Sequence, residues 1–276
     1  MKIIEKTKNF ILFASLISFI NCADDKIIDF NSENVLPTGE NSKDWELVFQ
    51  DEFNSNSLDL AKWSAGLGWI DKKAERRSKF TNENIFFDDG KLILKAEIYS
   101  DDIYSAAINS KNKFFQRYGF FEAKLKAGEG NGVISRWFGK QFLRHWAPAI
   151  DAVQIMGDNP DADSLYGINK NNAAIRWLIA PERETSRGKV FKISDDSLKN
   201  DFHIIGIKWQ PDEIIWYLDG EKVLSISEGT EDINVPLYWI FDLSYCDNFE
   251  IPNYECPDSS ANNTARMEVD YFRVWR

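Results

Sequence analysis

The segment from Trp146 to Gln154 carries side chains whose types and spacing could do chemistry. It places an indole at Trp146, a carboxylate at Asp151 and an amide at Gln154. Indole rings stack on apolar faces, while carboxylates and amides hydrogen-bond polar groups. A lone carboxylate could activate water as a base, but general acid catalysis needs a second group that donates a proton. The segment therefore indicates binding of a polar ligand with apolar faces. It does not supply the pair of groups that acid-base catalysis needs.

The elements around this segment follow the alternating pattern of β-strands. Apolar and polar residues alternate over short stretches, and turn signals such as Asp88-Asp89-Gly90 and Asp219-Gly220 separate them. Long helical periodicity and internal repeats are not found. The pattern predicts an all-β sandwich made by one domain of about 230 residues. The predicted strands include Lys91–Ile98, Phe120–Lys126, Ile204–Trp209, Glu213–Leu224 and Met267–Trp275.

The charge balance excludes several classes of function. The 276 residues include 33 Lys and Arg, 44 Asp and Glu and two His, and the formal net charge is -11. Nucleic-acid binding is not expected, because a phosphate backbone is bound by clustered Lys and Arg. The two histidines, His145 and His203, leave little basis for a His-rich metal site or a His-activated nucleophile, and we expect both to be structural.

The N-terminus has the pattern of an export signal. Lys2, Lys6 and Lys8 precede the uncharged apolar run Phe10–Ile20. This run has eleven residues, which is too few to span a hydrocarbon core of ~30 Å as a helix. Residues 1–21 are therefore predicted to be a signal peptide.

Cys22 directly after the apolar run resembles the lipidation site of a bacterial lipoprotein, in which this Cys becomes the new N-terminus. The acidic start Ala23-Asp24-Asp25 is similar to that of surface-exported lipoproteins in Bacteroidetes-type bacteria. The resemblance implies an outer-membrane lipoprotein that faces the cell exterior and meets the membrane only through its lipid. Ordinary secretion with an incidental Cys22 is the alternative. The polar residues 22–43 are predicted to be the lipidated N-terminus and a tether.

Two further cysteines, Cys246 and Cys256, flank a loop rich in Asn and Pro. An oxidising compartment favours a disulfide between them, and closing this loop would stabilise the fold by roughly 2–3 kcal/mol. Two unpaired thiols that never meet are the alternative.

Seven stretches between Trp45 and Arg276 resemble glycoside hydrolase family 16, the group of laminarinases, lichenases, agarases and carrageenases. The resemblance implies a concave β-jelly roll of two antiparallel sheets, the concanavalin A-like lectin/glucanase fold, with a sugar-binding cleft on one face. It places residues 44–276 in one domain. The stretches are Leu47–Phe53, Leu58–Trp63, Tyr104–Asn109, Tyr118–Lys126, Asp201–Trp209, Ile215–Gly220 and Val269–Trp275.

The catalytic strand of this family has the motif E-x-D-x-x-E, in which a β-bulge turns both glutamates and the Asp toward the cleft. The matching residues here are Ala149, Asp151 and Gln154. Retaining hydrolysis needs a carboxylate nucleophile and a carboxylic acid about 5–5.5 Å apart. Ala149 has no nucleophilic atom, and the amide of Gln154 cannot serve as the acid. No catalytic residue is expected at these degenerate positions.

The resemblance also implies which residues contact a sugar. These predicted contacts are Trp146, Trp137, Asp151 and Gln154, together with Trp69, Arg76 and Arg77 from the segment that borders the cleft in the family. Two further positions depart from the family pattern, because Ile134 replaces a cleft Trp and Phe120 replaces a common Arg. Trp209, Trp216 and Trp275 lie in apolar strand patterns and are predicted to be core residues.

Three interpretations follow for function. The leading one is a surface protein that binds a β-linked polysaccharide, a laminarin-like β-glucan or a marine galactan, without cleaving it, alongside outer-membrane components of glycan uptake. The first alternative is a hydrolase that uses Asp151 or Asp158 in a rearranged carboxylate site. The second is a structural or partner-binding module with an abandoned cleft. No cofactor and no metal site is expected, and the structural calcium of some relatives is not specified by this sequence.

Overall fold

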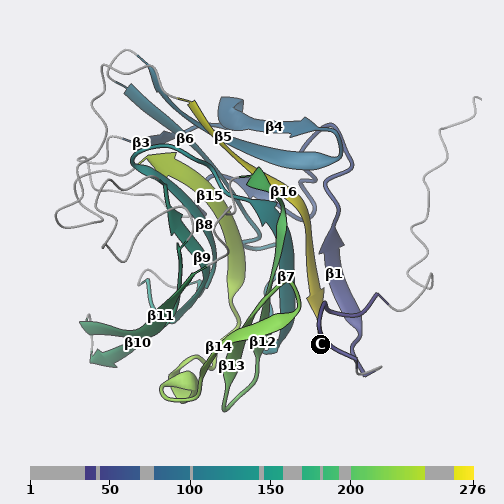
Figure 1. The fold of residues 1–276 in the computed structure, drawn as a ribbon, viewed down its shortest axis with the longest axis vertical. Helices are drawn as coiled ribbons and strands as arrows, with labels where there is room; N and C mark the ends of the chain where they lie inside the picture. The colour runs from purple at the N-terminus through teal and green to yellow at the C-terminus, as the bar shows by residue number, and fades with distance from the viewer. Residues whose placement is uncertain are drawn as a thin grey trace, which may run out of the picture. The chain divides into compact units, whose positions relative to one another are not determined.

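The computed structural model describes residues 35–41, 44–68, 78–99, 102–142, 146–157, 170–180, 183–192, 200–245 and 264–276, all within the compact unit Asn34–Arg276. Nearly all regular structure in these residues is β-strand (Figure 1). The first strands are β1 (Leu47–Asp51), β2 (Ser64–Ala65), β3 (Ser78–Phe80), β4 (Ile85–Asp88), β5 (Lys91–Tyr99), β6 (Asp102–Asn109), β7 (Gly119–Lys126) and β8 (Val133–Lys140). The others are β9 (Ala149–Met156), β10 (Lys170–Ala180), β11 (Arg183–Lys192), β12 (His203–Trp209), β13 (Ile214–Leu218), β14 (Glu221–Ile226), β15 (Tyr238–Tyr245) and β16 (Thr264–Trp275). Two short 3-10 helices, η1 (Asn82–Asn84) and η2 (Thr230–Asp232), complete the described elements.

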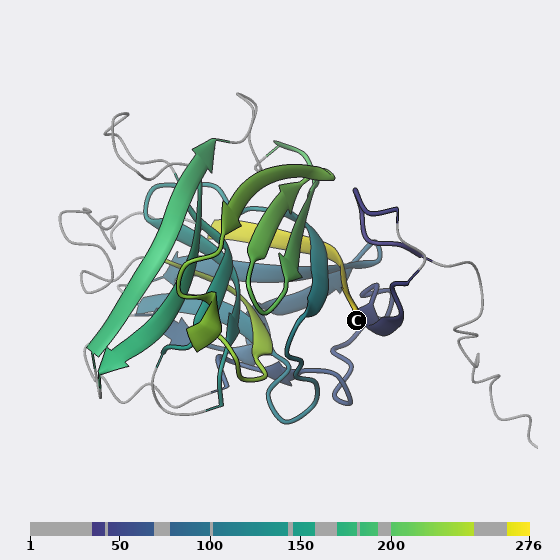
Figure 2. The same cartoon turned by 90° about the horizontal axis from the view of Figure 1, so that it is seen from below.

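The strands form one continuous sheet that is folded into two layers. Its order is β11-β10-β9-β8-β15-β6-β5-β16-β7-β12-β13-β14. Strand β6 belongs to both layers, because its last residues pair with β15 and its first residues pair with β5. Figures 1 and 2 show the β8–β11 layer lying against the layer that contains β7, β12 and β16, which we call the second layer. This arrangement confirms the predicted all-β jelly roll.

Apolar side chains fill the space between the layers. The largest fully buried rings are six tryptophans, which confirms the core prediction for Trp209, Trp216 and Trp275. Each buried aromatic ring removes ~150–250 Å² from water, so these rings contribute strongly to the association of the two layers. The six tryptophans are Trp63, Trp137, Trp209, Trp216, Trp239 and Trp275.

The turn at Asp219-Gly220 lies where the sequence predicts it and joins β13 to β14. Asp219 has φ of 50° and Gly220 has φ of 85°, the left-handed conformation that tight hairpin turns require. Gly39 lies against this turn so closely that a Cβ on it would be 2.3 Å from the Gly220 carbonyl oxygen.

Residues 35–41 pack on the second layer. The backbone N–H of Thr38 donates to Glu122 Oε2 at 2.7 Å, and Lys208 Nζ donates to Glu40 Oε1 at 3.0 Å. Residues 35–41 therefore differ from the predicted tether, because polar groups of this segment are bound to strands β7 and β12. Within the described residues, no helix is long and apolar enough to cross a membrane.

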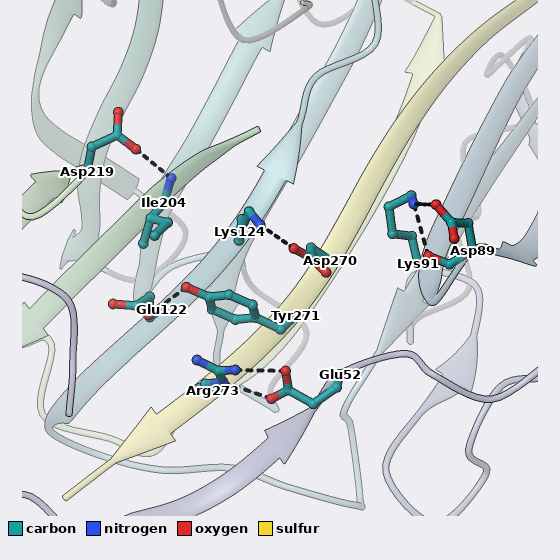
Figure 3. A network of polar contacts seen from close by, with 10 residues as sticks. All are labelled: Glu52, Asp89, Lys91, Glu122, Lys124, Ile204, Asp219, Asp270, Tyr271 and Arg273. Atoms are coloured by element: carbon teal, nitrogen blue, oxygen red, sulfur yellow. Dashed lines mark hydrogen bonds and ion pairs between the residues drawn. The ribbon is translucent and has the colours of Figure 1, made fainter. Parts of the chain in front are cut away.

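Polar groups on the outer face of the second layer are paired with one another (Figure 3). Arg273 makes two hydrogen bonds of 2.8 Å to the carboxylate of Glu52, and the Tyr271 hydroxyl donates to Glu122 at 2.9 Å. Burial raises the pKa of Glu122 despite its hydrogen bonds to Thr38 and Tyr271. The carboxylates of Glu52 and Glu122 therefore serve to hold this layer and the adjacent N-terminal segment.

Candidate functional site

A β-bulge in β9 places the three motif positions on one face. Trp137 of β8 pairs with Val153, whereas the next residue, Phe138, pairs with Asp151, so β9 contains one extra residue. Ile150, Ala152, Val153 and Ile155 all belong to the core between the layers. Because side chains alternate on either side of the bulge, Ala149, Asp151 and Gln154 share the opposite face.

The side chain of Asn171 on β10 stabilises this bulge. Its amide nitrogen donates to the Ala152 carbonyl oxygen at 2.9 Å, and its Oδ1 accepts from the backbone N–H of Gln154 at 2.9 Å. A bulge interrupts the ladder of backbone hydrogen bonds, and buried backbone groups need partners. Asn171 is fully buried and supplies both partners from one side chain.

Cross-strand pairing surrounds the motif with basic and aromatic residues. Ala149 lies between Lys140 of β8 and Arg176 of β10, and Asp151 lies between Phe138 and Ala174. Adjacent strands are about 4.8 Å apart, so these side chains are neighbours on the same face. Ala149 is therefore flanked by two basic residues.

Asp151 forms an ion pair with Arg176. The Arg176 Nε donates to Asp151 Oδ2 at 2.7 Å, while the Asp151 side chain is 5% exposed and that of Arg176 is 31% exposed. Burial raises the pKa of Asp151, and the charges of Arg176 and Arg136 partly oppose this effect. The carboxylate is thus engaged by a guanidinium and almost removed from solvent.

A second carboxylate on this face, Asp242 of β15, is held in the same way. Arg136 Nε and Nη2 each donate to the Asp242 carboxylate at 2.8 Å, and both side chains are buried. Asp242, Arg136 and Gln154 are consecutive partners across β15, β8 and β9. Among the described residues of this face, the carboxylates of Asp151 and Asp242 are both paired with arginine.

Lys140 lies beside the fully buried Ala149, and only 3% of Lys140 is exposed. Burial lowers the pKa of Lys140 to about 8, with a further contribution from Lys111 and an opposing one from Glu184. The methyl group of Ala149 therefore lies beside a desolvated amine.

The segment before β9 holds Trp146 over this face. Its ring stacks on Phe138 with centroids 5.0 Å apart and an interplanar angle of 25°. The backbone N–H of Ala147 donates to Glu184 Oε1 at 3.1 Å, and Gln141 donates to the Ala147 carbonyl oxygen. These bonds connect the segment to β11 and to the end of β8. Trp146 is therefore fixed on the face of the sheet that carries Ala149, Asp151 and Gln154, which we call the ligand face.

A pocket of about 660 Å³ opens beside Gln154 over β9, β10 and β11. Its size is within the range of ~300–1,000 Å³ typical of small-molecule sites. Gly188 keeps part of its wall flat, because a Cβ there would be 2.7 Å from the Cβ of Ala174. The polar residues that line the pocket are Gln154, Asn172, Arg176, Ser186 and Lys189.

This architecture has known counterparts. A family model described as "Beta-porphyranase A-D, GH16 domain" matches residues 45–276. The chain belongs to glycoside hydrolase family 16.

Similarity to individual family 16 proteins is distributed over most of the chain. A glucan endo-1,3-beta-glucosidase A1 from Niallia circulans is 27% identical over 87% of this chain, and the match spans only 39% of that protein. The laminarinase catalytic domain from Thermotoga maritima MSB8 superposes with a TM-score of 0.68 and 22% identity, covering 85% of this chain and 99% of that one. A LamA variant from Z. galactanivorans in complex with laminaritriose and laminaritetraose gives a TM-score of 0.67 and 21% identity over 83% and 98% of the two chains.

In this family 16 domain, one predicted sugar contact is wrong. Trp137 is fully buried between the layers, where its ring stacks on Phe241 with centroids 5.7 Å apart. The odd positions of β8 point into the core, and Trp137 lies just before the register shift, so it cannot reach the ligand face.

The other predicted contacts divide into two groups. Trp146, Asp151 and Gln154 lie together on the ligand face, although only Gln154 among them lines the pocket. Outside the described residues lie Trp69, Arg76, Arg77, Asp158, His145, Cys22, Cys246 and Cys256. Within the described residues, no group of three or more His, Cys, Asp and Glu could hold a metal ion.

Sequence reasoning missed the contribution of β10 and β11. Asn172, Arg176, Ser186 and Lys189 line the pocket, and Asn171 supports the bulge. The alternation Asn172-Ala173-Ala174-Ile175-Arg176 is a strand signal that could have identified two of these positions, Asn172 and Arg176.

Proposed function

We propose that this family 16 domain binds a β-linked polysaccharide on the face of β8–β11 without cleaving it. The observation that carries the proposal is the bulged strand β9, which presents Ala149 and Gln154 where the family has its two catalytic glutamates. The geometry of a sugar-binding family is thus retained while its reactive groups are replaced.

Asp151 and Asp242, two described carboxylates of this face, do not support a substitute mechanism. An inverting route needs one carboxylic acid and one carboxylate about 6.5–9.5 Å apart, with room for water. Asp151 and Asp242 are both buried and ion-paired with arginine, so neither is placed to activate a water molecule. Binding without cleavage agrees with this arrangement.

The charge of the pocket favours an anionic polysaccharide. The residues of β10 and β11 whose side chains are described include five basic ones and one acidic one, whereas the whole chain has a net charge of -11. Arg176 and Lys189 line the pocket itself. Sulfate esters and carboxylates are bound by such cations, which favours a marine galactan over a neutral laminarin-like β-glucan.

Separate observations bear on the two alternatives, a rearranged hydrolase and an abandoned cleft. The raised pKa of Asp151 is a property of general acids, which supports a rearranged hydrolase. The full burial of Ala149 and the stacking of Trp146 on Phe138 support an abandoned cleft. The open pocket beside Gln154 favours binding over the second of these alternatives.

Affinity electrophoresis tests the proposal. The purified protein is run through gels that contain laminarin, lichenan, agarose, carrageenan or xyloglucan, and the same mixtures are assayed for reducing ends. We expect retardation by one polysaccharide, weaker at high salt if the ligand is anionic, and no product. Free migration in every gel would contradict the proposal, whereas product that disappears in Asp151→Asn would establish the hydrolase.

We also propose that the domain is carried on the cell surface by a lipid on Cys22. The proposal is based on the apolar run Phe10–Ile20 and on the Cys that follows it. A lipid anchor would keep a polysaccharide-binding domain at the outer membrane, where its ligand could pass to glycan-uptake components.

A further inference from the structure

An aromatic pair with one exposed ring lies next to the ligand face. Phe115 follows β6 in the chain and has 52% of its surface exposed. Its ring contacts Phe142 edge to face at 5.1 Å, and Phe142 contacts Tyr238 of β15 at 5.3 Å. We refer to Phe115 and Phe142 as the aromatic platform, with Tyr238 as its buried support.

The platform is continuous with the ligand face. Tyr238 pairs with Lys140 of β8, and it belongs to a small apolar cluster with Phe138 and Ile240 that is separate from the main core. Phe142 and Trp146 both pack against this cluster. This small apolar cluster therefore connects the stacked Trp146–Phe138 pair with Tyr238, Phe142 and the exposed ring of Phe115.

The platform and the pocket lie apart from each other across the sheet. The pocket lies over β9, β10 and β11, whereas Tyr238 belongs to β15, beyond β8. At about 4.8 Å per strand, the three steps from β10 to β15 span roughly 15 Å across the sheet. Only a ligand several sugar rings long could contact both places at once.

The turn that carries Phe115 is basic. Residues 110–118 contain Lys111, Lys113 and Arg117 and no acidic residue. Lys111 Nζ lies 5.8 Å from the ring centroid of Tyr238 and donates to the Gly68 carbonyl oxygen at 2.7 Å. Positive charge thus occurs at both ends of the face in a chain whose net charge is -11.

We propose that the aromatic platform is a second contact for the polysaccharide, in which Phe115 stacks on a sugar ring several units away from the one in the pocket. The inference rests on the proposed binding function. The apolar C–H face of a pyranose ring would cover the exposed Phe115 ring, and the neighbouring cations would face its hydroxyl or anionic substituents. It follows that affinity depends on chain length.

The Phe115→Ala variant tests this contact. Retardation is measured first in the gel of whichever of the five polysaccharides retards the wild type, and then with fragments of graded length made from it by partial acid hydrolysis. We expect Phe115→Ala to weaken binding of the polymer and of long fragments by about 5–20-fold and to leave short fragments within about twofold. Phe115→Tyr retains the ring and is expected to bind like the wild type.

Phe86→Ala is the matched control. Phe86 on β4 is 43% exposed, beside Lys95, and lies in the second layer away from β8–β11. It is expected to bind like the wild type. If the wild type is retarded and Phe115→Ala matches it at every fragment length, the platform is not a sugar contact. If no gel retards the wild type, the proposed function itself fails, so the two failures are distinguishable.

Discussion

Removal of Arg176 should destabilise the protein through the carboxylate that it leaves behind. Asp151 is 3% exposed and accepts a hydrogen bond of 2.7 Å from Arg176. Methionine in place of Arg176 retains much of the aliphatic length but has no charge. The buried carboxylate must then stay ionised without its partner or take up a proton.

These two possibilities set the size of the effect. Breaking a buried ion pair by removing one partner costs about 3–5 kcal/mol. Protonation of the carboxylate limits this cost. A carboxyl with the reference pKa of 3.8 can be neutralised for 1.36 kcal/mol per pH unit above that pKa. The limit is about 4 kcal/mol at pH 7 and about 1.6 kcal/mol at pH 5. Because burial already raises the pKa of Asp151 in the wild type, these figures are upper limits. We therefore expect Arg176→Met to lower the free energy of unfolding by up to about 4 kcal/mol at pH 7 and by no more than about 1.6 kcal/mol at pH 5.

Urea unfolding followed by tryptophan fluorescence at both pH values measures this difference. Arg187→Met is the matched control, because Arg187 on β11 pairs with Glu228 while both side chains are largely exposed. Its cost should be below about 1 kcal/mol at either pH. Adding Asp151→Asn to Arg176→Met should remove the pH dependence, since an amide does not ionise. Equal losses at pH 5 and pH 7, or a loss no larger than the control's, would refute the reasoning.

Three further predictions concern other sites. Asn171→Ala should lower the free energy of unfolding by about 2–3 kcal/mol, because it leaves the Ala152 carbonyl and the Gln154 N–H without their partner; Asn172→Ala, measured in parallel by urea unfolding, should cost less than half as much. The pKa of Lys140 is lowered to about 8 in the folded protein. Between about pH 8 and pH 10.5, the unfolded state therefore binds more protons than the folded state. The contribution of Lys140 should raise the free energy of unfolding by up to about 3 kcal/mol as the pH rises through that window. Lys140→Met should lack this rise, and identical pH profiles of wild type and variant would contradict the assignment. Finally, metabolic labelling with a fatty-acid analogue should label the wild type but not Cys22→Ala, and a labelled variant would show that the lipid, if any, lies elsewhere.

The strand pattern was predictable because it depends on neighbouring residues. The alternation in Lys91–Ile98 and Met267–Trp275 predicts strands that form as β5 and β16. The Asp219-Gly220 turn is equally local, since its left-handed backbone suits those two residue types. The resemblance around Asp151 correctly predicted a bulge that puts Ala149 and Gln154 on one face.

The placement of the individual rings was harder to predict. Trp137 and Phe138 are adjacent and both apolar, yet one lies in the main core and the other on the ligand face. Their alternation alone does not say which face is which, because that depends on the layer packed against β8. The family resemblance therefore placed Trp137 on the wrong side of β8.

By itself, the sequence determined the strand periodicity, the turns and the residue types at positions 149, 151 and 154, since these depend on residues close together in the chain. Only the tertiary structure decided the electrostatics of the ligand face. Arg136 and Asp242 are separated by 106 positions, and Asp151 and Arg176 by 25, yet each pair meets across the sheet. Strand order brings these charges together, and burial strengthens their interaction and shifts the pKa of Asp151.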